Sequence, residues 1–306
     1  MDVGFGLPVS GAWATPANQV HIARRAEALG YRSLWTFQRL LIPAEPEGVA
    51  ASPAYRSVLD PVVSLAHVAA VTERVRLGVA VLNMPFFSPA LLAKQLASLD
   101  VLCGGRLDAG LGLGWSPEEY AVSGVPYERR GIRGEEFLAV LRALWTQEVA
   151  EHHGEFYELP PVRSEPKPVQ RPHPPILLGG SAEPALRRAG RLADGWISSS
   201  RADMTNLHAS IAIIAEAARQ AGRDPATLRY VARVPVHPGP AAGHPDRRPL
   251  TGSFEQIRAD LGELAAQGLT ELFIDLNWNP QVGSPDADPA AALALAEATL
   301  EALAPA

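Results

Sequence analysis

The sequence predicts an α/β fold, a (β/α)8 barrel with inserted loops, and two observations lead to it. Short runs rich in Val, Ile and Leu alternate with helix-like segments from one end of the 306-residue chain to the other. The apolar runs are nearly continuous, as expected of parallel strands that are covered on both faces. Eight such repeats in a chain of this size favour a closed barrel over a doubly wound sheet.

Local signals support the individual elements. Strands are expected at residues 3–7, 33–37, 75–83, 106–114, 175–179, 195–199, 228–236 and 271–277. Helices are expected at residues 16–29, 60–72, 88–102, 134–145, 181–190, 204–222 and 253–268 and near the C-terminus. Asp60 and Pro61 suit the start of the second helix, and Gly30 suits the end of the first. We expect the Pro- and Gly-rich stretches to be loops inserted into one domain, residues 1–306.

Composition and charge exclude several classes of protein. The net charge of −6 argues against a nucleic-acid-binding surface. No apolar run is as long as a membrane helix, and the N-terminus lacks the pattern of a signal peptide, so we expect a soluble cytoplasmic protein. Cys103 is the only cysteine, which rules out an internal disulfide. His152 and His153 lie in an expected hairpin without a third ligand nearby, so no metal site is expected.

The active site of such a barrel lies at the C-terminal ends of its strands. The residues expected there are mostly polar: Ser10, Gln38, Arg39, Asn83, 112–115, 179–181, 198–201, His237 and 277–279. They include no pair of carboxylates for glycosidase-type chemistry. An arginine beside an amide, as at Gln38 and Arg39, suits an anionic or carbonyl ligand. His237 is a candidate ligand contact, and tryptophans near the strand ends suit an aromatic ligand.

The stretch GLGLGW, residues 110–115, allows two interpretations. Its glycines are spaced by two and continue a strand, whereas a dinucleotide fingerprint opens a helix. Glycines on one face of a strand either leave room for a flat ligand or allow close packing inside the barrel. After it, Ser116 is expected to cap a short helix, with Glu119 closing a capping box.

A second glycine site, LLGGS, is the better candidate for binding phosphate. A strand ends there, Gly179 and Gly180 turn the chain, and Ser181 is expected to cap the next helix. Free N–H groups and the helix dipole would then face an anion. An ordinary strand-to-helix turn has the same appearance, so both interpretations stay open.

Two motifs together, LDVLCGGRLDAGLGLGW (99–115) and PHPPILLGGS (172–181), resemble the bacterial-luciferase-like monooxygenase family. The resemblance is closer to the branch that uses the deazaflavin coenzyme F420. It implies a (β/α)8 barrel whose cofactor ring lies against a bulge near Leu82–Asn83, often with a cis peptide. It also implies that Gly112, Gly114 and Trp115 line the cofactor's side chain. Residues Gly179, Gly180 and Ser181 would donate N–H groups to its phosphate.

The chain departs from that family at the end of the second strand. Many F420-using members have an acid-His pair there, whereas this sequence has Gln38 and Arg39, neither of which titrates near neutral pH. We therefore expect Arg39 to hold a carbonyl or carboxylate, aided by Asn83, with Asn277 as a further candidate. The proton would come from Glu118, Glu119, His237 or water.

The resemblance implies an F420-dependent oxidoreductase that transfers a hydride between the coenzyme and a small organic substrate with a C=C, C=N or C=O bond. One alternative is an FMN-dependent monooxygenase that uses reduced FMN and oxygen. Another is a barrel that binds a flavin or other ligand without catalysis. By resemblance we also expect a homodimer, formed through the helices beside the second and third strands. The identity of the substrate does not follow from the sequence.

Overall fold

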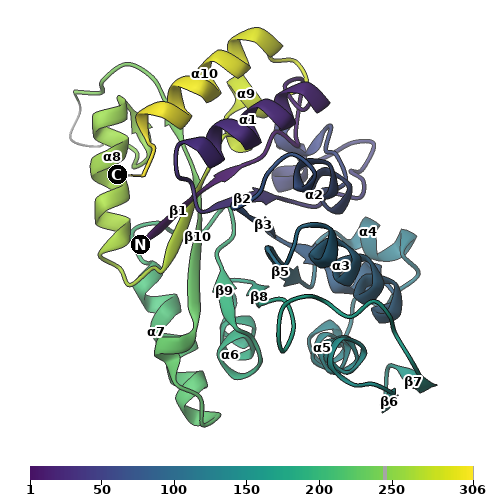
Figure 1. Ribbon diagram of the computed structural model, residues 1–306. Helices are drawn as coiled ribbons and strands as arrows, with labels where there is room; N and C mark the ends of the chain where they lie inside the picture. Colours follow the sequence, from purple (N-terminus) through teal and green to yellow (C-terminus); the bar gives the residue numbers. More distant parts are fainter. Residues whose placement is uncertain (244–246, 306) are drawn as a thin grey trace.

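The computed structural model describes residues 1–243 and 247–305, and its central sheet is a closed parallel barrel (Figure 1). The strands are ordered β3–β2–β1–β13–β10–β9–β8–β5–β4, and β3 also pairs with β5, which closes the barrel. Because β3 and β4 both pair with β5, together they occupy one of the eight strand positions of the barrel, as predicted. The barrel strands are β1 (Asp2–Gly6), β2 (Ser33–Thr36), β3 (Arg76–Val79), β4 (Leu82–Asn83), β5 (Leu107–Gly112), β8 (Ile176–Gly179), β9 (Gly195–Ile197), β10 (Arg229–Pro235) and β13 (Glu271–Asp275).

Helices surround the barrel (Figure 1). They are α1 (Pro16–Ala28), α2 (Pro61–Ala69), α3 (Pro89–Leu102), α4 (Pro117–Val122), α5 (Arg130–Thr146), α6 (Glu183–Leu192), α7 (Leu207–Gln220), α8 (Phe254–Ala265), α9 (Pro280–Gly283) and α10 (Pro289–Ala302). The predicted end of α1 and the predicted start of α2 are confirmed. Asp60 Oδ1 accepts from the N–H groups of Val62 and Val63, and Gly30 has the left-handed φ of 85° after α1. The expected hairpin is also present, as β6 (Ala150–His153) and β7 (Glu158–Val162).

The N-terminal end of the barrel is filled by a buried charge network. The fully buried Asp108 of β5 accepts hydrogen bonds from Arg76 at 2.5 Å and Arg229 at 2.6 Å. Arg229 also donates to Glu271, which accepts from Ser33. Alternating carboxylates and guanidinium groups compensate one another's loss of hydration.

An apolar layer lies above this network. Trp35 and Phe273 stack with their ring centroids 5.1 Å apart, and they pack with Leu177 and Val231. Trp35 occupies the space of a side chain at Gly78, where a Cβ would lie 2.3 Å from the indole ring. These two filled layers leave space only at the C-terminal end of the barrel.

The first of the alternating glycines of β5, Gly110, allows two strands to pack closely. A Cβ at Gly110 would lie 1.7 Å from the carbonyl oxygen of Val79 on β3. Of the two interpretations of GLGLGW, packing inside the barrel therefore holds at Gly110. At Gly112 the space is taken by the side chain of Val81, 2.4 Å from a Cβ built there.

Gly110→Ala should destabilise the protein strongly, because a backbone carbonyl of a central strand cannot move aside. Thermal unfolding by circular dichroism measures the effect. The matched control is Gly262→Ala in α8, where nothing lies within 4 Å of the added Cβ. There the substitution should stabilise by about 0.5–1 kcal/mol, since alanine favours a helix over glycine. A Gly110→Ala variant as stable as the wild type would contradict the packing seen in the barrel.

Candidate active site

A cavity of about 330 Å³ opens at the C-terminal ends of the strands. Its walls come mainly from segments at and after the ends of β2, β3, β5, β8 and β9, which are far apart in the sequence. Many predicted mouth residues line it: Gln38, Arg39, Asn83, 112–115, 179–181 and 198–201. Further lining residues not named in advance are Phe37, Tyr55, Ala80, Val81, Arg130, Ala182, Ala185, Ile197 and Arg233.

The floor of the cavity is built around Val81. Its side chain lies over two glycines, since Cβ atoms at Gly112 and Gly179 would lie 2.4 and 3.0 Å from its methyl groups. A cis peptide bond lies in the cavity floor at Ala80–Val81, so the expected position near Leu82–Asn83 is wrong by two residues. Leu82 is fully buried in the hydrophobic core and does not line the cavity. Asn83 does line it, and its N–H donates to Gln38 Oε1 at 2.8 Å.

Arg233 of β10 reaches the floor from inside the barrel. It is 5% exposed, and its Nε donates to Asp275 Oδ2 at 2.6 Å. Its Nη1 donates to the carbonyl oxygen of Ala80 at 3.1 Å, next to Val81. Its guanidinium carbon lies 4.7 Å from the ring centroid of Phe37 and 5.0 Å from that of Trp278. This arginine therefore holds the backbone of the floor in place.

Arg39 lies against two aromatic rings in the cavity wall. Its guanidinium carbon is 4.3 Å from the ring centroid of Tyr55 and 4.5 Å from that of Trp115. Its Nη1 is 3.1 Å from Glu119 Oε2, and both side chains are almost completely buried. The two ring centroids are 6.0 Å apart, so both aromatic rings contact the guanidinium group from adjacent directions and form cation–π contacts with it.

Glu119 connects this wall to α4. Its Oε1 accepts from the N–H of Leu40 at 2.7 Å, and the whole residue is buried. The expected capping box is therefore only half present: Ser116 caps α4 by accepting from the N–H of Glu119, but the Glu119 carboxylate crosses to residues 39–41. The same Ser116 hydroxyl also donates to the Glu118 carboxylate.

The start of α6 forms the third wall. The N-cap is Ala182, one residue after the predicted Ser181, so no side chain caps this helix. Gly180 has a φ of +138°, a conformation that favours glycine, and a Cβ there would lie 2.6 Å from the Ala185 Cβ. The uncapped N–H groups of the first turn and the helix dipole favour an anion.

Two further arginines line the cavity, Arg130 at the start of α5 and Arg201 after β9. Within the described residues, neither forms an ion pair with a carboxylate. Arg130 stacks on Tyr127 at 3.9 Å and donates to its carbonyl oxygen. Among the described residues, no acid pairs with these two positive charges of the cavity wall.

Other predicted mouth residues lie outside the cavity. His237 belongs to the short strand β11 (His237–Pro238), which pairs with β12 (Thr251–Gly252), and it is absent from the cavity wall. Burial and the nearby charge of Arg248 lower the pKa of His237. Asn277 hydrogen-bonds to the backbone of Val9 and Ser10, and the Ser10 hydroxyl donates to Ala54 and Gly283 carbonyls. These residues join chain segments beside the barrel mouth.

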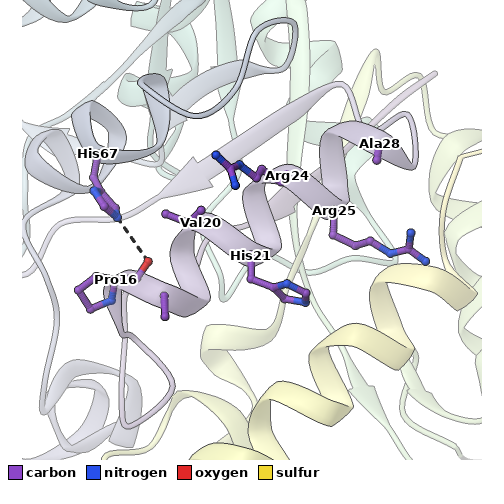
Figure 2. A pocket seen from close by; sticks show the side chains of 8 residues that line it. Pro16, Val20, His21, Arg24, Arg25, Ala28 and His67 are labelled. Carbon is purple, nitrogen blue, oxygen red and sulfur yellow. Dashed lines mark hydrogen bonds between the residues drawn. The ribbon is translucent and has the colours of Figure 1, made fainter.

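A wider hollow of about 740 Å³ lies on the outside of the molecule, against α1 (Figure 2). Its walls are side chains of α1 together with His67 of α2, whose Nε2 lies 3.3 Å from the Pro16 carbonyl oxygen. No strand end contributes to it, so despite its larger volume it is a poorer candidate site than the barrel mouth.

In the part of the chain that the structure describes, no group of three or more His, Cys, Asp or Glu side chains is arranged to bind a metal ion. No helix among these residues has the length and apolar character to cross a membrane.

Comparison with known proteins shows what this barrel is similar to. The family model described as luciferase-like monooxygenase matches residues 3–248. An uncharacterized Mycobacterium tuberculosis protein, Rv0953c, is 37% identical over 249 residues, which cover 78% of this chain and 86% of that protein. The FMNH2-dependent dimethylsulfone monooxygenase of Pseudomonas putida is 39% identical over 140 residues, 44% of this chain and 38% of that enzyme.

Solved structures agree on the fold. The coenzyme F420 dependent tetrahydromethanopterin reductase of Methanopyrus kandleri superposes with a TM-score of 0.75, covering 99% of this chain and 98% of that one, at 16% identity. The closed barrel, the cavity at its strand ends and the family match lead to one conclusion. The chain belongs to the luciferase-like monooxygenase family, whose members are oxidoreductases and monooxygenases.

Proposed function

We propose that this protein is an F420-dependent oxidoreductase that transfers a hydride between the deazaflavin coenzyme and a small organic substrate with a C=C, C=N or C=O bond. The observation that carries the proposal is the charge of the cavity. Arg130 and Arg201 line the same cavity as the uncapped start of α6, and neither forms an ion pair with a carboxylate among the described residues. A cofactor whose side chain carries a phosphate followed by carboxylates suits such a wall better than one with a single phosphate.

The residues present fit a planar cofactor with an anionic side chain. A flat ring would lie on Val81 at the floor, beside Asn83. The N–H groups at Gly180–Ala182 would hold a phosphate, and a side chain at Gly180 would obstruct that turn. Arg201 would then meet the outer, more exposed part of the cofactor.

When bound, the reduced coenzyme would supply a hydride, that is, two electrons and a hydrogen. The chain's own residues bind and orient the acceptor. Arg39, which lines the cavity beside Tyr55 and Trp115, would hold its carbonyl or carboxylate through the guanidinium N–H groups. Glu119 is committed to Arg39 and to the backbone of residues 40 and 41. The proton that completes the reduction would then come from water at the open end of the cavity.

Titration of the cofactor-free protein with coenzyme F420 and FMN, side by side, tests the proposal. We expect F420 to bind at least tenfold more tightly than FMN at low salt. Arg201→Ala should weaken F420 more than FMN, because Arg201 would contact the charges beyond the phosphate. Arg25→Ala, on the outer face of α1, is the matched control and should change neither. Tight binding of FMN with none of F420 would refute the proposal.

The similarity to the Pseudomonas putida enzyme, which uses reduced FMN, favours an FMN-dependent monooxygenase as the second candidate. A monooxygenase would consume oxygen when reduced FMN and substrate are present. An F420-dependent oxidoreductase would reduce or oxidise its substrate at the same rate with oxygen removed. A protein that binds either cofactor but transfers no hydride to any acceptor would instead be a binding barrel.

A further inference from the structure

The hydrogen-bonding capacity of Arg39 is largely unused. A guanidinium group has five N–H donors, and Arg39 directs one nitrogen, Nη1, at Glu119. Its Nε is completely buried and has no hydrogen-bond partner in the described structure. Glu119 Oε1 accepts from the N–H groups of Leu40 and Leu41, whereas Oε2, 3.1 Å from Arg39 Nη1, is buried without a well-formed hydrogen bond.

An acceptor from outside the protein can use the donors of Arg39 that face the cavity. A buried charged donor left without a partner is unfavourable, so its presence in a cavity wall needs an explanation. The Arg39 side chain is only 5% exposed and lines the cavity. Tyr55 and Trp115 both lie beside the guanidinium group, and their ring centroids are only 6.0 Å apart, so they cover adjacent sides of it and not its two opposite faces. A planar oxyanion, which accepts two parallel hydrogen bonds, matches the paired donors of a guanidinium group.

We propose that Arg39 binds the carboxylate of the substrate, so that the protein acts on small organic acids with an apolar or aromatic body. This inference deepens the proposed function, because it names the substrate class of the same site. Phe37, Tyr55 and Trp115 provide the surface for the apolar body. Glu119 orients Arg39 and also competes with the substrate, since its Oε2 occupies one edge of the guanidinium group without a well-formed hydrogen bond.

A neutral carbonyl substrate is the main alternative, and a matched pair of probes separates the two. Hexanoate and hexanamide have nearly the same shape and differ in charge. Calorimetric titration of the cofactor-free protein, and of the protein with saturating oxidised F420, gives both dissociation constants. We expect the acid to bind at least tenfold more tightly than the amide in one or both states. In cofactor-free protein the acid should also change the fluorescence of Trp115, a signal that Trp115→Phe identifies.

Two substitutions assign the preference to Arg39. Arg39→Met should reduce the preference for the acid to less than twofold, and Arg39→Lys should retain only part of it, because lysine lacks the planar fork. Glu119→Gln keeps an acceptor for the N–H groups of residues 40 and 41 and should tighten hexanoate about fivefold. Arg25→Met, on the surface, should leave both constants unchanged.

Equal binding of acid and amide in both states of the wild type would overturn the inference. Persistence of the preference in a folded Arg39→Met variant, verified by circular dichroism, would also overturn it. The proposed function fails on a different result, the absence of F420 binding. The acid preference of the cofactor-free protein does not depend on that outcome.

Discussion

Asp108→Asn is expected to destabilise the protein by roughly 3–5 kcal/mol, the usual cost of removing one partner from a buried ion pair. Asp108 is completely buried and accepts from both Arg76 and Arg229. Asparagine keeps the size of the side chain but leaves two guanidinium groups facing no charge on that side. Thermal unfolding should show a fall in Tm on the order of 10 °C. Asp286→Asn, which removes an exposed ion pair with Arg56, is the control and should change Tm little.

Asp108 also contributes to the pH dependence of the protein's folding stability on the acid side. Burial alone would raise the pKa of Asp108, but the hydrogen bond from Arg76 and the charge of Arg229 lower it overall. A lowered pKa in the folded state stabilises the fold above the unfolded-state pKa of about 3.9, and this contribution disappears as the pH falls below that value. Asp108→Asn should therefore lose stability at neutral pH and show a smaller further loss on the acid side. A wild-type-like acid profile would contradict this role of Asp108.

Arg39→Ala is expected to lower turnover about 10²–10³-fold, the size of effect seen when a preorganised donor to developing charge is removed. The Kd for the coenzyme should stay within about threefold, because Arg39 lies against Tyr55 and Trp115 and apart from the α6 turn. Steady-state kinetics with the best acceptor from a panel of unsaturated acids gives the turnover. Fluorescence titration gives the Kd.

Unfolding of the variant must be distinguished from a loss of turnover, since Arg39→Ala leaves the buried Glu119 without its cation. The double variant Arg39→Ala/Glu119→Gln removes that charge and should be more stable than Arg39→Ala while staying equally inactive. Parallel losses in turnover and coenzyme affinity would instead place Arg39 on the cofactor.

The barrel could be predicted because its signals are local. Each strand is a short apolar run and each helix has its own capping residue, such as Asp60 or Gly30. The pairing that closes the barrel, between β3 and β5, follows from the alternation and needs no further information. The exact position of the floor did not follow, because the cis bond at Ala80–Val81 depends on contacts with Gly112 and Gly179 from other strands.

The site could be predicted only where a residue directly follows a strand. Tyr55 comes from the long loop after β2, and its place against Arg39 depends on how that loop packs. Glu119 satisfied a local capping pattern, yet its carboxylate pairs with a residue 80 positions earlier. Arg233 was within reach of sequence reasoning. It stands two residues after Val231 and four after Arg229, so all three lie on the same face of β10, and that face points into the barrel.

The filled lower half of the barrel also has a kinetic consequence. The ion network around Asp108 and the stacked pair Trp35–Phe273 seal one end, so molecules enter and leave only by the mouth above Val81. Whatever rests directly on Val81 must arrive before anything that lies over it and must depart afterwards. Two reactants sharing this dead-end chamber would therefore associate in a compulsory order, with the deeper one retained over successive turnovers.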